Sequence, residues 1–125
     1  MKQTSPYQVI YNDDEIVVLN KKSGLLVAAD RYDQFAPRLD VEAKKEFGDL
    51  LAIHRIDKDT SGLVIYARTA EAHKNLSLQF QNRQVTKIYH ALVHGRPNWQ
   101  NLRVDLKLLP DGDSLHRTVV HRKQG

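Results

Sequence analysis

The chain has 125 residues and a net charge of +4 at pH 7, with 41% hydrophobic and 27% charged residues. This length fits one domain or part of one, the composition is that of a folded protein, and the basic charge is compatible with a polyanionic partner. The absence of cysteine excludes a disulfide scaffold, a thiolate zinc site and a cysteine nucleophile. No signal peptide or membrane-spanning apolar run is visible, so we expect a soluble protein of the cytoplasm.

The first half of the chain predicts a β-hairpin followed by a short helix. Residues 7–11 and 16–20 are β-rich runs on either side of a polar turn. Residues 38–47 predict a helix, because apolar residues recur every four positions and Gly48 follows as a stop signal. A short apolar run at residues 50–53 then leads into a polar stretch.

The second half predicts one more helix and several strands. Residues 62–67 form a nearly continuous apolar run, which is typical of a buried strand, and Thr69 is a suitable N-cap for a helix over residues 70–84. Strands are predicted at residues 85–93, at the strictly alternating residues 102–108, and at residues 118–121. The predicted fold class is α+β, with a mixed or mainly antiparallel sheet on which two helices pack.

The densest polar cluster is HRIDKDTSG at residues 54–62, between two apolar runs. It contains a titratable histidine, a fixed cation and two carboxylates: His54, Arg55, Asp57 and Asp59. A loop anchored at both ends can hold such side chains rigidly toward a cleft. A solvated turn with local salt bridges explains the same residues, and the residue types alone leave both interpretations open.

Three segments, in order, resemble the RluA-like pseudouridine synthases. Residues 54–63, HRIDKDTSGL, resemble the H-R-L-D-x-x-T-S-G-L signature of that family, with Ile56 in place of leucine. Residues 20–25, NKKSGL, resemble its N-K-P-x-G-L segment, with Lys22 where proline is usual. Residues 87–95, KIYHALVHG, resemble its K-x-Y-x-A-x-V-x-G segment.

The resemblance implies isomerisation of uridine to pseudouridine within RNA, without a cofactor or a metal and away from membranes. It implies that Asp57 is the catalytic aspartate, that Tyr89 packs against the target base, and that Arg55 fills the gap left by the flipped uridine. His54 and Lys21 are further candidates for substrate binding. An aspartate beside a cation stays ionised at neutral pH and can act as nucleophile or base, and the sequence leaves this choice open.

Simpler structural roles compete with some of these assignments. Tyr89 on an alternating strand could be an ordinary core aromatic, and Lys21 with Lys22 could form only a solubilising turn. If the nucleic-acid interpretation holds, we expect Lys21, Lys22, Arg55 and Lys58 to lie on one surface.

The pattern departs from the family after residue 95. The R-x-H-Q-I-R-like segment, whose basic residue pairs with the catalytic aspartate, is not found, and Arg117 and Arg122 lie outside such a context. We therefore expect residues 1–125 to be a catalytic domain truncated at its C-terminus, either a fragment or a degenerate paralogue. Two functions follow: a pseudouridine synthase acting on ribosomal or transfer RNA, in full or as its N-terminal portion, or a catalytically silent RNA-binding remnant.

Overall fold

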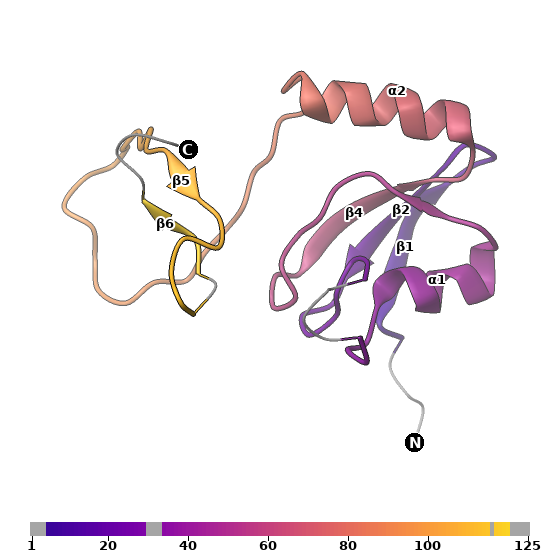
Figure 1. Ribbon diagram of the computed structural model, residues 1–125, viewed down its shortest axis with the longest axis horizontal. Coiled ribbons are helices and arrows are strands. Elements are labelled where there is room, and N and C mark those ends of the chain that lie inside the picture. Colours follow the sequence, from indigo (N-terminus) through magenta and orange to yellow (C-terminus); the bar gives the residue numbers. More distant parts are fainter. Residues whose placement is uncertain (1–4, 30–33, 116, 121–125) are drawn as a thin grey trace. The chain divides into compact units, whose positions relative to one another are not determined.

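The computed structural model describes residues 5–29, 34–115 and 117–120. The chain divides into two units, Met1–Ile88 and Tyr89–Gly125, and each is described by itself. The elements of the first unit are β1 (Tyr7–Asn12), β2 (Ile16–Lys21), α1 (Leu39–Phe47), β3 (Leu51–Ala52), β4 (Gly62–Ala67) and α2 (Ala70–Gln81) (Figure 1). The second unit contains β5 (Leu108–Leu109) and β6 (Val119–Val120).

The first unit is built on a four-stranded sheet in the order β1-β2-β4-β3. Every pairing in it is antiparallel, and β1 with β2 forms the expected hairpin. β2 and β4 pair over their full length, from Ile16 opposite Ala67 to Lys21 opposite Gly62. The predicted α+β class with a mainly antiparallel sheet and two helices is confirmed.

The core lies on one face of this sheet, where α1 packs. Val17 and Leu19 on β2 alternate with less buried neighbours, and both are fully buried together with Val64 and Tyr66 on β4. The buried residues Leu39 and Ala43 of α1 belong to the same cluster. On this face, alternate side chains of the strands therefore pack with α1 side chains that are four residues apart.

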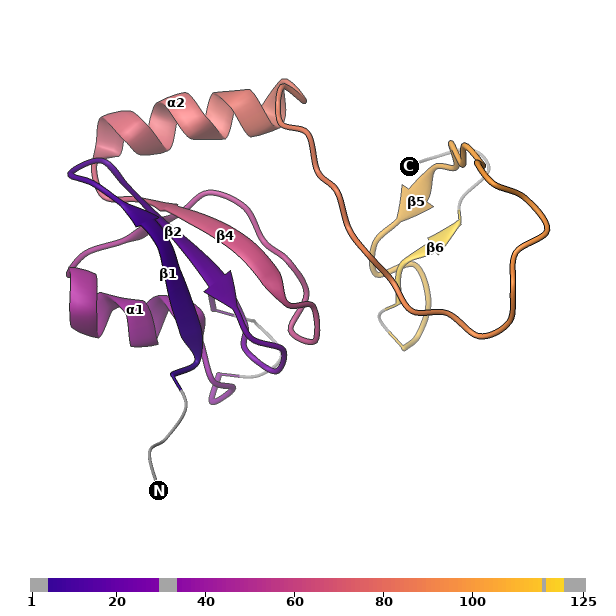
Figure 2. The same cartoon turned by 180° about the vertical axis from the view of Figure 1, so that it is seen from behind.

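α2 contacts β3 and β4, and the strands lie between it and α1 in both views (Figures 1 and 2). Thr69 is its N-cap, as predicted, and its hydroxyl oxygen accepts a hydrogen bond from the backbone N–H of Ala72 at 3.1 Å. The helix ends at Gln81, three residues before the predicted end. Arg83 has a φ of 55°, a left-handed conformation that stops helical propagation.

Two predicted strands are wrong. Residues 85–93 form no strand, and of residues 102–108 only Leu108 enters one, pairing with Val120. Alternation marks a segment that is able to form a strand, but a strand exists only when a neighbour pairs with its backbone groups, and no described residue does so here. The predicted strand at residues 118–121 is observed as β6, with His121 outside the described residues. Within the described part of the chain, no helix has the length and apolar character needed to cross a membrane.

Candidate active site

The polar cluster HRIDKDTSG lies in the loop between β3 and β4, and its last residue, Gly62, begins β4. Ile56 anchors the loop, because its side chain is only 8% exposed and belongs to the core cluster. A turn follows, in which the N–H of Thr60 donates to the carbonyl oxygen of Asp57 at 3.1 Å. Asp57 is exposed at the start of this turn. Its carboxylate forms no hydrogen bond or ion pair within 4 Å with any residue that the structure describes.

The carbonyl oxygen of Lys58 joins this loop to the NKKSGL segment. It accepts hydrogen bonds from the backbone N–H of Gly24 at 2.8 Å and from the Nζ of Lys21 at 2.9 Å. Lys21 also donates to the carbonyl oxygen of Lys22 at 2.9 Å. Gly24 has a φ of 96°, a conformation that favours glycine and brings its N–H to the loop. Two of the three segments that resemble the RluA-like family are thus bonded to each other.

Lys21 is the buried cation beside the two aspartates of the loop. It is 1% exposed, and burial lowers its pKa, while the charges of Asp59 and Asp57 act in the opposite direction. The expectation that Lys21 shares a surface with Lys22, Arg55 and Lys58 is therefore wrong for Lys21. Its ammonium lies inside because two carbonyl oxygens replace water as its hydrogen-bond partners. The other three residues are exposed.

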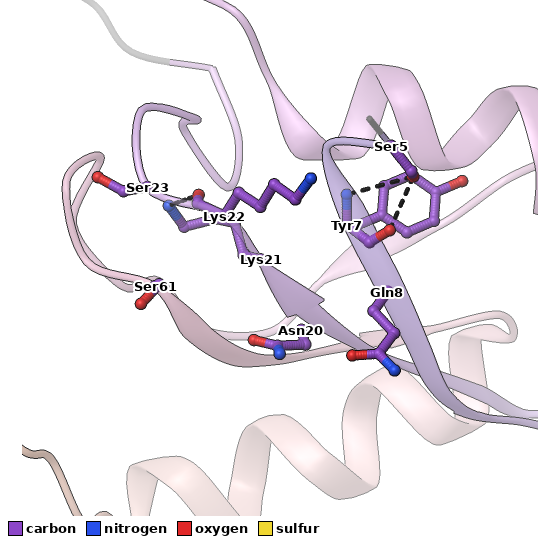
Figure 3. Close-up of a pocket in the computed structure, with 8 residues that line it drawn as sticks. All are labelled: Ser5, Tyr7, Gln8, Asn20, Lys21, Lys22, Ser23 and Ser61. Carbon is purple, nitrogen blue, oxygen red and sulfur yellow. Dashed lines mark hydrogen bonds between the residues drawn. The ribbon is translucent and has the colours of Figure 1, made fainter. Parts of the chain in front are cut away.

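An open pocket of about 390 Å³ adjoins these two segments (Figure 3). It is lined by Ser5, Tyr7, Gln8, Asn20, Lys21, Lys22, Ser23 and Ser61. The hydroxyl of Tyr7 donates a hydrogen bond to Glu46 at 2.6 Å. Burial, as the larger cause, and this hydrogen bond together raise the pKa of Tyr7 to about 12. The lining therefore offers hydroxyl, amide and ammonium groups, which are suited to a polar or anionic ligand. Within the described residues, no group of three His, Asp or Glu side chains is arranged to hold a metal ion.

His54 points into the fold. Its Nε2 accepts a hydrogen bond from the backbone N–H of Ile65 at 3.1 Å, and its ring stacks on that of Phe80 with centroids 4.6 Å apart. Burial lowers the pKa of His54, and the nearby Lys87 ammonium lowers it further. Arg55, the next residue, is exposed and forms no ion pair with Asp57. From His54 to Asp57, side chains held by the fold thus alternate with exposed side chains.

Tyr89 belongs to the second unit, where it is 58% exposed and outside any strand. Its contact with a target base stays a prediction. In the same unit, the guanidinium Nε of Arg117 donates to Asp113 at 2.7 Å. The pKa of Asp113 is lowered by two hydrogen bonds from Arg117, of which the bond from the backbone N–H has the larger effect and the bond from the side chain the smaller. Arg117 therefore already has a local carboxylate partner.

Sequence reasoning missed two parts of this arrangement. Phe80 stacks on His54 across a separation of 26 residues, and no spacing in the sequence marks the two as partners. The Lys58 carbonyl carries no side-chain signal, so its double acceptor role is visible only in the structure.

Comparisons with known proteins assign the chain to a family. The family model described as RNA pseudouridylate synthase matches residues 15–123. The dual-specificity RNA pseudouridine synthase RluA of Escherichia coli O6:H1 is 36% identical over 117 residues, which cover 94% of this chain and 53% of that protein. RluA of Pasteurella multocida is 33% identical over 123 residues, covering 98% of this chain and 56% of that protein.

A third relative, RluA of Vibrio parahaemolyticus, is 35% identical over 86% of this chain and 44% of its own length. The solved structure of human RNA pseudouridylate synthase domain containing 4 is 29% identical, covers 61% of this chain and 30% of that chain, and has a TM-score of 0.47. The chain spans about half the length of the curated relatives it matches. Because the family model covers most of the chain, including the whole loop around Asp57, the chain belongs to the RNA pseudouridylate synthase family and is similar to the RluA enzymes within it.

Proposed function

We propose that this chain carries the catalytic aspartate of an enzyme that isomerises uridine to pseudouridine in structured RNA, either ribosomal or transfer RNA, in the cytoplasm. The observation that supports this function best is the setting of Asp57. Its carboxylate is exposed and unpaired within the described structure, at the tip of a loop that Ile56 anchors in the core. A reactive group needs this combination of a fixed backbone and an open side chain.

The proposed reaction breaks the bond between N1 and C1′ of the uridine and forms one between C5 and C1′, and it balances because C5 loses its proton and N1 gains one. Both sites are inaccessible in a stacked base, so the uridine must be flipped out of the stack. We propose Asp57 as the nucleophile or base, and Arg55, which is exposed two residues before it, as the group that fills the vacated position. Tyr89 is proposed to stack on the flipped base, which contributes about 1–3 kcal/mol for an aromatic platform.

We further propose that residues 1–125 are part of a catalytic domain and that turnover needs the remaining part. Large apolar side chains in the second unit are exposed to a degree unusual for a finished domain: Leu92 by 103%, Val93 by 64%, Val104 by 66% and Leu106 by 59%. Their segments alternate as strands do but have no described pairing partner. Further strands supplied by the missing part would bury these side chains and pair these backbones.

The test compares Asp57→Asn with the matched control Asp59→Asn. Both substitutions remove one carboxylate charge from the same loop, and both residues are exposed. The chain is assayed alone, and also mixed with the part of the Escherichia coli RluA relative that it does not match, for conversion of uridine to pseudouridine in RNA. We expect little turnover by the chain alone.

In the mixture, we expect Asp57→Asn to abolish conversion and leave RNA binding nearly unchanged, because binding rests on many phosphate contacts. Asp59→Asn should retain conversion. Normal turnover by Asp57→Asn would refute the assignment of the catalytic carboxylate. RNA binding without conversion under either condition would favour the silent RNA-binding remnant instead.

A further inference from the structure

β3 stops pairing with β4 before β4 ends. The last pair of this ladder is Ala52 with Tyr66, and one further step of the same register would place Ile53 opposite Ile65. β4 continues to Gly62, paired on its other side with β2. The backbone N–H of Ile65 therefore needs an acceptor that β3 does not supply.

His54 supplies this acceptor. Its Nε2 lies 3.1 Å from the backbone nitrogen of Ile65. A backbone N–H can only donate, so Nε2 must carry the lone pair, and the imidazole is neutral with its proton on Nδ1. The flat face of the ring rests on Phe80 of α2, with 15° between the two planes. One side chain thus contacts both β4 and α2.

We infer that His54 is a positioning residue: its neutral imidazole takes the place of a β3 acceptor at Ile65 and so fixes the start of the loop that carries Arg55 and Asp57. The use of this loop in catalysis rests on the proposed function. The inference gives His54 a role inside the fold in place of the substrate contact expected from the sequence. With His54 and Ile56 both held, Arg55 between them and Asp57 after them have little freedom of backbone position.

Protonation would break this arrangement, because the proton would occupy the lone pair that Ile65 uses. The charge of Lys87 acts on the ring, and its Nζ is 5.4 Å from the Phe80 ring centroid. A second histidine, His73 on α2, has its Nε2 3.0 Å from the carbonyl oxygen of Ala52, two residues before His54. Burial and Lys87 lower the pKa of His54 in the folded chain, whereas the pKa of a histidine in an unfolded chain is about 6.5. The unfolded state therefore binds the proton first. The stability contributed by neutral His54 is complete above about pH 6.5 and is lost as the pH falls through the lowered pKa.

The first measurement is the tautomer of His54 in the full chain. Long-range ¹H–¹⁵N correlation spectra at neutral pH distinguish a protonated Nδ1 from a protonated Nε2. We expect the proton on Nδ1. A proton on Nε2, or a doubly protonated ring at neutral pH, overturns the inference.

The second measurement is hydrogen exchange of the Ile65 amide in matched variants. His54→Phe keeps a ring for stacking and removes the acceptor, and should accelerate exchange at Ile65 about tenfold, which corresponds to the loss of one ordinary hydrogen bond. His54→Gln retains an acceptor oxygen that does not titrate, and should keep the protection. His73→Phe, the control on α2, should leave Ile65 unchanged. Unaltered protection in His54→Phe overturns the inference.

A pH series separates positioning from general stability. In the wild-type chain, the amide signals of Arg55 and Asp57 should shift as His54 titrates, and Ile65 exchange, corrected for its intrinsic pH dependence, should accelerate. In His54→Gln, which has no titrating side chain at this position, neither change should occur over the same pH range. If His54→Phe does not fold, the pH series of the wild type and of His54→Gln tests the inference by itself. Amide signals of Arg55 and Asp57 that do not shift with the titration of His54 in the wild type overturn the inference. No readout uses RNA, so failure of the proposed function and failure of this inference are separate results.

Discussion

Replacing Lys21 with methionine tests whether this lysine holds the fold or contacts the substrate. Lys21 is 1% exposed, and its ammonium donates to the carbonyl oxygens of Lys22 and Lys58, both at 2.9 Å. Methionine has a similar length and no charge, so Lys21→Met removes both bonds with little change in packing volume. We expect the change to destabilise the first unit.

The magnitude follows from opposing effects. Each hydrogen bond from a charged donor contributes about 1.5–3 kcal/mol, so two contribute about 3–6 kcal/mol. Part of this loss is offset, because Lys21→Met also removes the desolvation penalty of the buried charge, which is several kcal/mol for an ion. The Lys58 carbonyl keeps its bond from Gly24, while the Lys22 carbonyl loses its lysine donor. We therefore expect the free energy of unfolding to fall by about 1–3 kcal/mol.

Urea denaturation, followed by circular dichroism, measures this change, with Lys22→Met as the control. Lys22 is adjacent and exposed, so its substitution removes the same charge and should change the free energy of unfolding by less than about 0.5 kcal/mol. Equal stability of the two variants would refute the structural role of Lys21. Loss of RNA affinity in Lys21→Met with unchanged stability would show that Lys21 contacts the substrate instead.

Two further predictions concern the core and the RNA surface. The hydroxyl of fully buried Tyr66 donates to the Val27 carbonyl oxygen at 2.7 Å, so Tyr66→Phe should lower the free energy of unfolding by about 1–2 kcal/mol in urea titrations. Tyr11→Phe, which loses an exposed bond to Asp13, should cost less than half as much, and equal losses would contradict this reasoning. The logarithm of the RNA-binding constant should fall linearly with the logarithm of the salt concentration, and Arg55→Gln should make that slope shallower by about 0.7–0.9, the value for one phosphate contact. Affinity that does not vary with salt would count against an RNA-binding surface, and an unchanged slope in Arg55→Gln would exclude a phosphate contact by this residue.

The sequence alone predicted β1, β2, β4 and both helices of the first unit, because their signals are local, whereas β3 was seen only as a short apolar run. The β-rich runs around the polar turn at residue 13 predicted the β1–β2 hairpin, and apolar residues at every fourth position predicted α1. Thr69 was predicted, and is observed, as the N-cap of α2. The motif around Asp57 also identified the family, which the comparisons confirmed. These features depend on residues that are close together in the chain, and local propensity is sufficient to predict them.

The tertiary structure decided what depends on distant partners. The sequence showed two lysines in one turn, but only the fold shows that Lys21 is buried against the Lys58 carbonyl while Lys22 stays exposed. Likewise, His54 bonds to Ile65 because β3 is too short to reach that amide, and no spacing in the sequence records where a strand stops pairing. The predicted strand at residues 85–93 was wrong for the same reason. Alternation gives a segment the ability to pair, but a neighbouring backbone must satisfy its N–H and C=O groups before a strand exists.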